Sequence, residues 1–82
     1  MKTAREMFEE LGYTLHENYD FDELEFRKDV EPTLVVTFDL SSKTVSAYGW
    51  ADYIDGFATH YMSMKELQAI NQMLKELGWL YE

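Results

Sequence analysis

The spacing of hydrophobic residues changes twice along this 82-residue chain. Apolar positions recur at helical spacing near the N-terminus, at Met7, Phe8 and Leu11, and again near the C-terminus, at Leu67, Ile70, Leu74 and Leu77. Between these segments apolar residues alternate with polar ones, which is the spacing of strands that bury one face. The pattern therefore predicts a helix, a β-rich middle and a second helix.

Both predicted helices have matching start and stop signals. Each begins with a hydroxyl residue three positions before a glutamate, as in a capping box, and ends at a glycine followed by an aromatic residue. These positions are Thr3, Glu6, Gly12 and Tyr13 in the first helix, and Ser63, Glu66, Gly78 and Trp79 in the second. We therefore predict helices over 4–11 and 64–77. In the second, we expect the stripe that begins at Leu67 to cover the sheet, with Lys65, Gln68, Asn71 and Lys75 facing water.

The middle of the chain predicts strands over 13–17, 24–27, 33–40, 44–48 and 57–61, with a loop over 49–56. In the strongest of them, Val35, Thr37 and Asp39 are expected to point away from the core. An antiparallel sheet with one apolar face needs a cover, and the two helices can supply it. The predicted fold class is α+β: an antiparallel sheet of three to five strands, flanked by an N-terminal and a C-terminal helix packed on one face. The length leaves room for a single domain, 1–82.

Charge and composition exclude several classes of partner. The chain has 16 acidic and 7 basic residues, a formal net charge of −9. This balance repels phosphate, so we expect neither direct nucleic-acid binding nor attachment to an anionic membrane. There is no cysteine, no long apolar run and no signal-peptide pattern. The predicted location is therefore the cytoplasm.

Residues that could carry out catalysis are few. The two histidines, His16 and His60, lie far apart in the sequence, and no pattern places either beside an activated nucleophile. Asp20 and Asp22 resemble the opening of a calcium loop, but the turn glycine and the closing glutamate are absent at their required offsets. The glycines are isolated, so no phosphate-binding loop is present. We predict no enzyme activity, no catalytic residue, no cofactor and no metal site.

Two groups of residues remain as candidates for binding a partner. The first is aromatic, since aromatic side chains often anchor protein interfaces, and consists of Trp50, Tyr53 and Phe57. Trp50 has an alternative role as a lid on the core. The second group is the densest acidic run and consists of Asp20, Asp22, Glu23 and Glu25. Leu80 and Tyr81 extend past the last helix and are candidates either for packing under it or for a homodimer contact.

Several segments resemble a group of small uncharacterised proteins encoded in phages and prophages of Gram-positive bacteria. The similar segments are 8–15, which begins FEELGY, 43–45, 64–71, which reads MKELQAIN, and 76–79, which reads ELGW. The resemblance covers most of the chain. It implies an intracellular, virus-associated setting, and it supplies no activity and no binding residue.

These observations lead to one main hypothesis and two alternatives. The main hypothesis is a non-enzymatic, phage-derived interaction protein that binds a host or phage protein. The first alternative is an acidic nucleic-acid mimic that occupies the basic groove of a DNA-binding enzyme. It requires one continuous face formed by Glu17, Asp20, Asp22, Glu23, Glu25, Asp29 and Glu31. The second alternative is a small hydrolytic or metal-dependent enzyme, which requires a pocket that contains His60 and two carboxylates.

Overall fold

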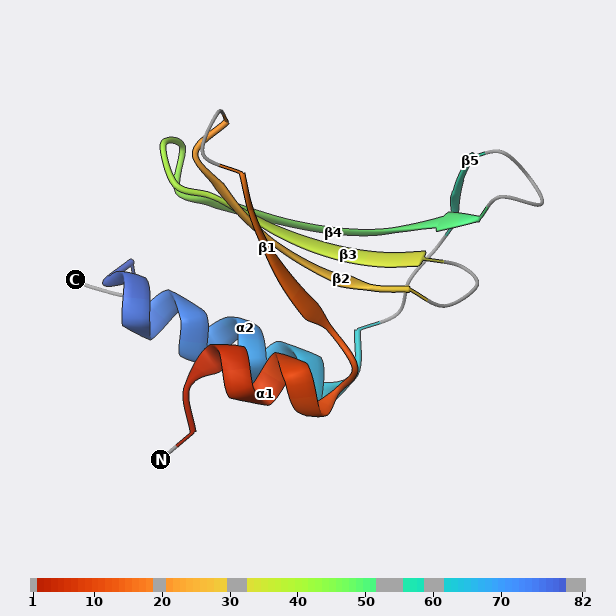
Figure 1. Cartoon of the computed structure of the whole chain (residues 1–82). Coiled ribbons are helices and arrows are strands. Elements are labelled where there is room, and N and C mark those ends of the chain that lie inside the picture. The colour runs from red at the N-terminus through yellow and green to blue at the C-terminus, as the bar shows by residue number, and fades with distance from the viewer. Residues whose placement is uncertain (1, 19–20, 30–32, 52–55, 59–61, 80–82) are drawn as a thin grey trace.

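The computed structural model describes residues 2–18, 21–29, 33–51, 56–58 and 62–79 (Figure 1). Its elements are α1 (Ala4–Glu10), β1 (Thr14–Asn18), β2 (Glu23–Lys28), β3 (Thr33–Asp39), β4 (Thr44–Ala51), β5 (Gly56–Ala58) and α2 (Met64–Leu77). The strands form one antiparallel sheet in chain order, β1-β2-β3-β4-β5. Both helices lie on the same face of this sheet and leave the other face open (Figure 1). The predicted α+β fold class is confirmed.

The capping signals form the predicted helix ends. The Thr3 hydroxyl accepts from the Glu6 N–H at 3.2 Å, and the Glu6 carboxylate accepts from the Thr3 N–H at 2.8 Å. Ser63 and Glu66 form the same reciprocal pair at the start of α2. Gly78 has a φ of 76°, the left-handed conformation that glycine adopts without a Cβ penalty. Local chemistry therefore sets where both helices begin and where α2 ends.

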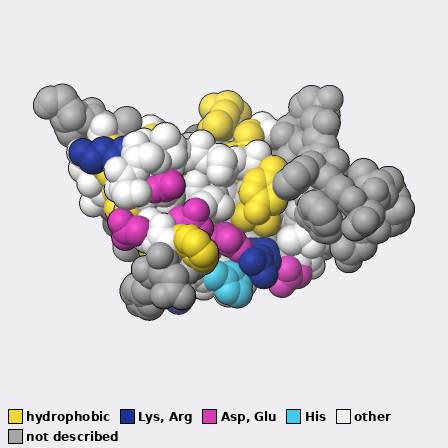
Figure 2. All heavy atoms as spheres, turned by 90° about the horizontal axis from the view of Figure 1, so that it is seen from above, with side chains coloured by type: hydrophobic (Ala, Val, Ile, Leu, Met, Phe, Trp, Pro, Cys, Tyr) yellow, Lys and Arg dark blue, Asp and Glu magenta, His cyan; other side chains and the backbone are white. Residues whose placement is uncertain are grey.

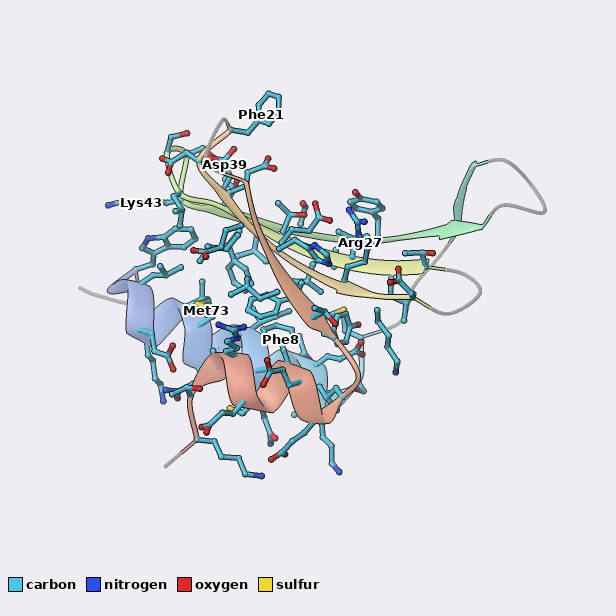
Figure 3. The ribbon with its side chains drawn as sticks, in the orientation of Figure 1. Phe8, Phe21, Arg27, Asp39, Lys43 and Met73 are labelled. Carbon is cyan, nitrogen blue, oxygen red and sulfur yellow. The ribbon has the colours of Figure 1, made fainter. Side chains whose placement is uncertain are left out.

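A stack of aromatic rings fills the space between the helices and the sheet. The rings of Phe8 from α1 and Phe26 from β2 are stacked with centroids 4.1 Å apart. Phe38 from β3 meets both edge-on, at 6.3 Å and 6.1 Å. All three side chains are fully buried, and Met73 of α2 packs against the same cluster (Figure 3). One core on one side of the sheet therefore holds the fold together.

The orientation of α2 differs from the prediction. Its buried residues are Glu66, Ala69 and Met73, whereas Leu67 is 45% exposed. The Tyr13 hydroxyl donates a buried hydrogen bond to the Glu66 carboxylate at 2.5 Å, which draws this side of α2 inward. Because successive residues of a helix are rotated by about 100°, Leu67 is turned toward solvent. The expectation that Leu67 lies in the core stripe is wrong.

The predicted loop over 49–56 is also wrong in part. β4 continues to Ala51, and its residue Trp50 pairs with Thr33 of β3 and with Phe57 of β5. The long ladder offered by β3 explains the extension, because unpaired backbone groups beside a strand are costly. The predicted strand over 57–61 corresponds to β5, which begins one residue earlier and is described over Gly56–Ala58. Residues 59–61 lie outside the described residues.

Val35 was expected to point outward, and its alternation with the buried Val36 does place it on the open face. It is nevertheless only 4% exposed. Its cross-strand neighbours are Arg27 and Tyr48, whose long side chains can cover a small apolar residue. The open face therefore holds a buried apolar side chain, Val35, beneath longer neighbours.

Candidate functional site

The open face of the sheet carries a mixture of charges. Cross-strand register places His16, Glu25, Thr37 and Ser46 in one row across the strands. The neighbouring row contains Thr14, Arg27, Val35 and Tyr48. Figure 2 shows this face from above, with acidic, basic and histidine side chains beside apolar ones. The open face is therefore not a uniformly acidic surface.

Glu25 is paired within this face. The Arg27 guanidinium donates to one carboxylate oxygen of Glu25 through both Nε, at 3.0 Å, and Nη2. An ion pair near the surface adds little to stability, but it compensates the charge of Glu25 locally. Among the described members of the predicted acidic group, Glu25 is therefore less available to an outside cation than the exposed Asp22.

The turns at one end of the sheet form a second surface, which we name the hairpin-end surface. It comprises Phe21, Asp22, Glu23, Asp39 and Lys43. Phe21 is 68% exposed and points away from the sheet (Figure 3). Glu23 and Asp39 face each other across β2 and β3, and Asp22 is exposed beside them. Aromatic and acidic groups therefore lie together at this end.

A hydrogen bond between the two turns holds part of the backbone of this surface in place. Asp22 has a φ of 55°, and its carbonyl accepts from the Leu40 N–H at 2.9 Å. Aspartate tolerates this left-handed conformation better than most residues. The bond ties the β1–β2 turn to the end of β3, so Phe21 projects from a supported turn.

Asp39 organises the β3–β4 turn. Its Oδ1 atom accepts from the Ser41 N–H at 3.1 Å, the Ser41 hydroxyl at 2.9 Å and the Ser42 N–H at 3.1 Å. Hydrogen bonds from Ser42 and Ser41 lower the pKa of Asp39 below its ordinary value. Asp39 therefore stays ionised, and its carboxylate stabilises the turn by accepting these hydrogen bonds.

Lys43 provides a test of this turn. It has a φ of 58°, a conformation that costs a residue with a Cβ roughly 1–2 kcal/mol. We expect Lys43→Gly to raise the free energy of unfolding by about 0.5–1 kcal/mol, after allowing for the greater entropy of glycine in the unfolded chain. Urea denaturation measures the change. The neighbouring Ser42→Gly is the control, because Ser42 has no positive φ and its replacement should destabilise. Equal effects of both variants would contradict the assignment.

The structure separates the binding residues predicted from the sequence. Asp22 and Glu23 meet at the hairpin end, with Glu25 further along β2. The backbones of Trp50 and Phe57 are paired at the opposite end of β4, and their side chains lie outside the part that the structure describes. Tyr53 and Asp20 lie outside the described residues. The described members of the two predicted groups therefore lie at opposite ends of the sheet or, in the case of Glu25, between them.

Sequence reasoning missed Phe21 as a binding candidate. The residue was noted only as an interruption of the acidic run, and its neighbours Asp20 and Asp22 mark a turn. An apolar residue between turn-forming residues has no partner strand to pack against. That local signal could have identified it as an exposed aromatic group.

The acidic residues required for a nucleic-acid mimic are not all on one side of the sheet. Glu17 is paired with Leu24, which packs against the core, whereas Glu23 and Glu25 alternate with Leu24 and point to the open face. Asp20 and Glu31 lie outside the described residues. The described members of the set therefore form no continuous row, and the geometry gives the mimic hypothesis no support.

Other candidate sites are limited in the part of the chain that the structure describes. No group of three or more His, Asp or Glu residues there could hold a metal ion. His16 is exposed, and His60 lies outside that part. Shallow hollows occur between α1 and α2, at Met7, Leu11 and Gln68, and along α2 at Met64, Leu67 and Leu74. Among the described helices, none has the length and apolar character needed to cross a membrane.

Comparison with protein-family models, with curated proteins and with solved structures finds no match to this chain. The resemblance to phage and prophage proteins therefore stays a prediction from the sequence.

Proposed function

We propose that this chain is a non-enzymatic interaction protein that binds a host or phage protein through the hairpin-end surface. The observation that carries the proposal is the side chain of Phe21, which is 68% exposed on a hydrogen-bonded turn. A large apolar side chain in water has a favourable free energy of burial that a partner's pocket can use. Exposed aromatic residues of this kind are frequent energetic centres of interfaces.

The hydrogen bonds next to Phe21 reduce the free energy that binding must spend on ordering the backbone. Association loses free energy whenever a flexible segment must become ordered. Here the Asp22 carbonyl already bonds to the Leu40 N–H, and Asp39 already accepts the amides of its own turn. These bonds fix the backbone of Asp22 and of the β3–β4 turn before a partner binds.

The charge around Phe21 indicates the chemistry of the partner. Asp22 and Glu23 directly follow Phe21 in the chain, and the whole chain has a formal net charge of −9. A protein with an apolar pocket and a basic rim would complement this surface, and its association would be accelerated at low salt. Raising the ionic strength should therefore slow association more than it changes dissociation.

The cytoplasmic and phage-related setting belongs to this proposal: composition supports the cytoplasm, and the sequence resemblance alone supports the phage-related origin. Trp50, Tyr53 and Phe57 remain a second, separate candidate contact, predicted from the sequence. We propose no catalytic, cofactor or metal role for any residue.

Affinity capture with matched variants tests the proposal. Phe21→Ala and Met64→Ala remove side chains of nearly equal exposure, 68% and 69%, from different surfaces. We expect one stoichiometric protein to be captured by the wild type and by Met64→Ala. Phe21→Ala should weaken its binding by roughly thirtyfold or more, the loss of an interface hot spot. Equal capture by all three proteins, or none at low and high salt, would contradict the proposal.

A further inference from the structure

β1 is an edge strand, and within the described sheet no other strand pairs with its outer side. The strand order begins with β1, which pairs with β2 alone. Both helices lie against one face of the sheet rather than along this edge (Figure 1). The outer side of β1 therefore presents strand backbone that the fold itself leaves without a neighbouring strand.

This edge lacks the usual features that prevent further pairing. Proteins protect sheet edges with very short strands, prolines, lysines or bulges. The strand at the other end of the sheet, β5, is short, with three residues over Gly56–Ala58. β1 has five residues, Thr14–Asn18, in uninterrupted register with β2, and it contains no proline and no lysine. Its N–H and C=O groups recur at strand spacing, which only another extended backbone complements.

The side chains of β1 indicate what an added strand would carry. Leu15 pairs with Phe26 of the core, so it lies on the helix-facing side, where it is only partly buried. Thr14 and His16 are exposed on the open face. A strand with an apolar residue beside Leu15 and polar residues beside Thr14 and His16 would continue both faces of the sheet.

The charge near this edge favours a basic strand. β1 contributes one carboxylate, Glu17, and neither lysine nor arginine. Beyond its end the chain continues to Asp22 and Glu23, and the whole chain has a formal net charge of −9. Electrostatic complementarity therefore favours a segment with lysine or arginine and disfavours a second copy of this acidic chain.

We propose that an extended, basic segment of the partner protein adds to the sheet as a strand along the outer edge of β1. Antiparallel pairing is the more stable arrangement. β1 leads into the turn that carries Phe21, three residues beyond Asn18, so the added strand continues the hairpin-end contact. The inference rests on the proposed function and adds the form of the partner's segment, which is recognised by β-strand addition.

A synthetic strand tests the edge without the partner. The probe is acetyl-TVTKTVT-amide, written so that in antiparallel pairing its lysine lies opposite Glu17 and its second valine opposite Leu15. We expect the full chain to bind it with a dissociation constant of about 1 mM or tighter. The largest changes in amide NMR signals should fall in β1. Hydrogen exchange should slow at every second amide of β1, because alternate N–H groups point to the outer edge.

Two N-methylated versions of the probe are the matched controls, one methylated at the threonines and the other at the valines and the lysine. Only one of these sets of N–H groups faces β1 in a paired strand. One version should therefore bind like the probe, and the other should lose affinity by roughly thirtyfold or more. The acidic probe acetyl-TVTETVT-amide should bind roughly tenfold more weakly than the basic one.

No change in the β1 signals at about 5 mM probe overturns the proposal. Equal affinities of the two methylated versions overturn it as well, and so does a dimer of the chain paired through β1 in sedimentation equilibrium. Equal binding of the acidic probe contradicts the basic character of the strand. The probe has no group intended for Phe21. A failed titration therefore leaves the capture experiment with Phe21→Ala unaffected, and a failed capture leaves the titration unaffected.

Discussion

Phe8→Ala is expected to lower the free energy of unfolding by about 3–5 kcal/mol, the largest stability change among the predictions. The ring is fully buried between α1 and the sheet and touches three other aromatic residues, Tyr13, Phe26 and Phe38. Its removal would leave a cavity that rigid aromatic neighbours cannot close. A domain of this size has a total stability of about 5–15 kcal/mol, so the variant should be close to unfolding.

Urea denaturation followed by circular dichroism measures the effect of Phe8→Ala. The control is Phe21→Ala, which removes the same atoms from a site that is 68% exposed. This control should change the free energy of unfolding by less than about 0.5 kcal/mol. Similar losses for the two variants would show that the aromatic stack is not the centre of the core.

Tyr13→Phe is expected to cost about 1–3 kcal/mol. The Tyr13 hydroxyl is the donor of the hydrogen bond to the Glu66 carboxylate, at a site where Tyr13 is 2% and Glu66 6% exposed. Removing the donor takes one hydrogen bond from a buried charged group, which is more costly than losing a bond at the surface. The same carboxylate closes the capping box of α2 through the Ser63 N–H. The loss should therefore loosen the start of α2.

The pH dependence of stability provides a second test of this pair. Burial and the nearby Glu66 carboxylate raise the pKa of Tyr13 well above the ordinary value of about 10. A raised pKa means that the folded state holds the proton more tightly than the unfolded state. The stabilisation is complete below pH 10 and is lost as the pH rises above it, by up to about 1.4 kcal/mol per pH unit. The free energy of unfolding of the wild type should therefore approach that of Tyr13→Phe as the pH rises above 10, as urea denaturation at each pH measures. A constant difference between the two proteins would contradict the buried pair.

The helix ends could be predicted from the sequence because they depend on neighbouring residues. Thr3 and Glu6 bond to each other within one turn, and Gly78 adopts its conformation without outside help. The alternation of apolar residues in β2 and β3 likewise predicted which residues face the helices, since Phe26, Val36 and Phe38 are all fully buried. These features are local, and local patterns are sufficient for them.

The features that sequence reasoning missed depend on contacts between distant segments. The rotation of α2 follows from the hydrogen bond between Tyr13 and Glu66, residues 53 positions apart. The length of β4 follows from its pairing with β3 as far as Thr33. The candidate site was predicted in part: Asp22 and Glu23 were named, but the exposed aromatic residue beside them was not. Which side chains share a surface depends on strand register, and register is not evident from composition or charge.

The most direct test of the central claim is amide hydrogen exchange of the wild type with and without its captured partner. Binding is expected to slow exchange in the two turns of the hairpin-end surface, around Phe21 and around Ser41, while exchange in α1 is unchanged. Slowed exchange confined to the helices, or to the paired ends of β4 and β5 around Trp50, would contradict it.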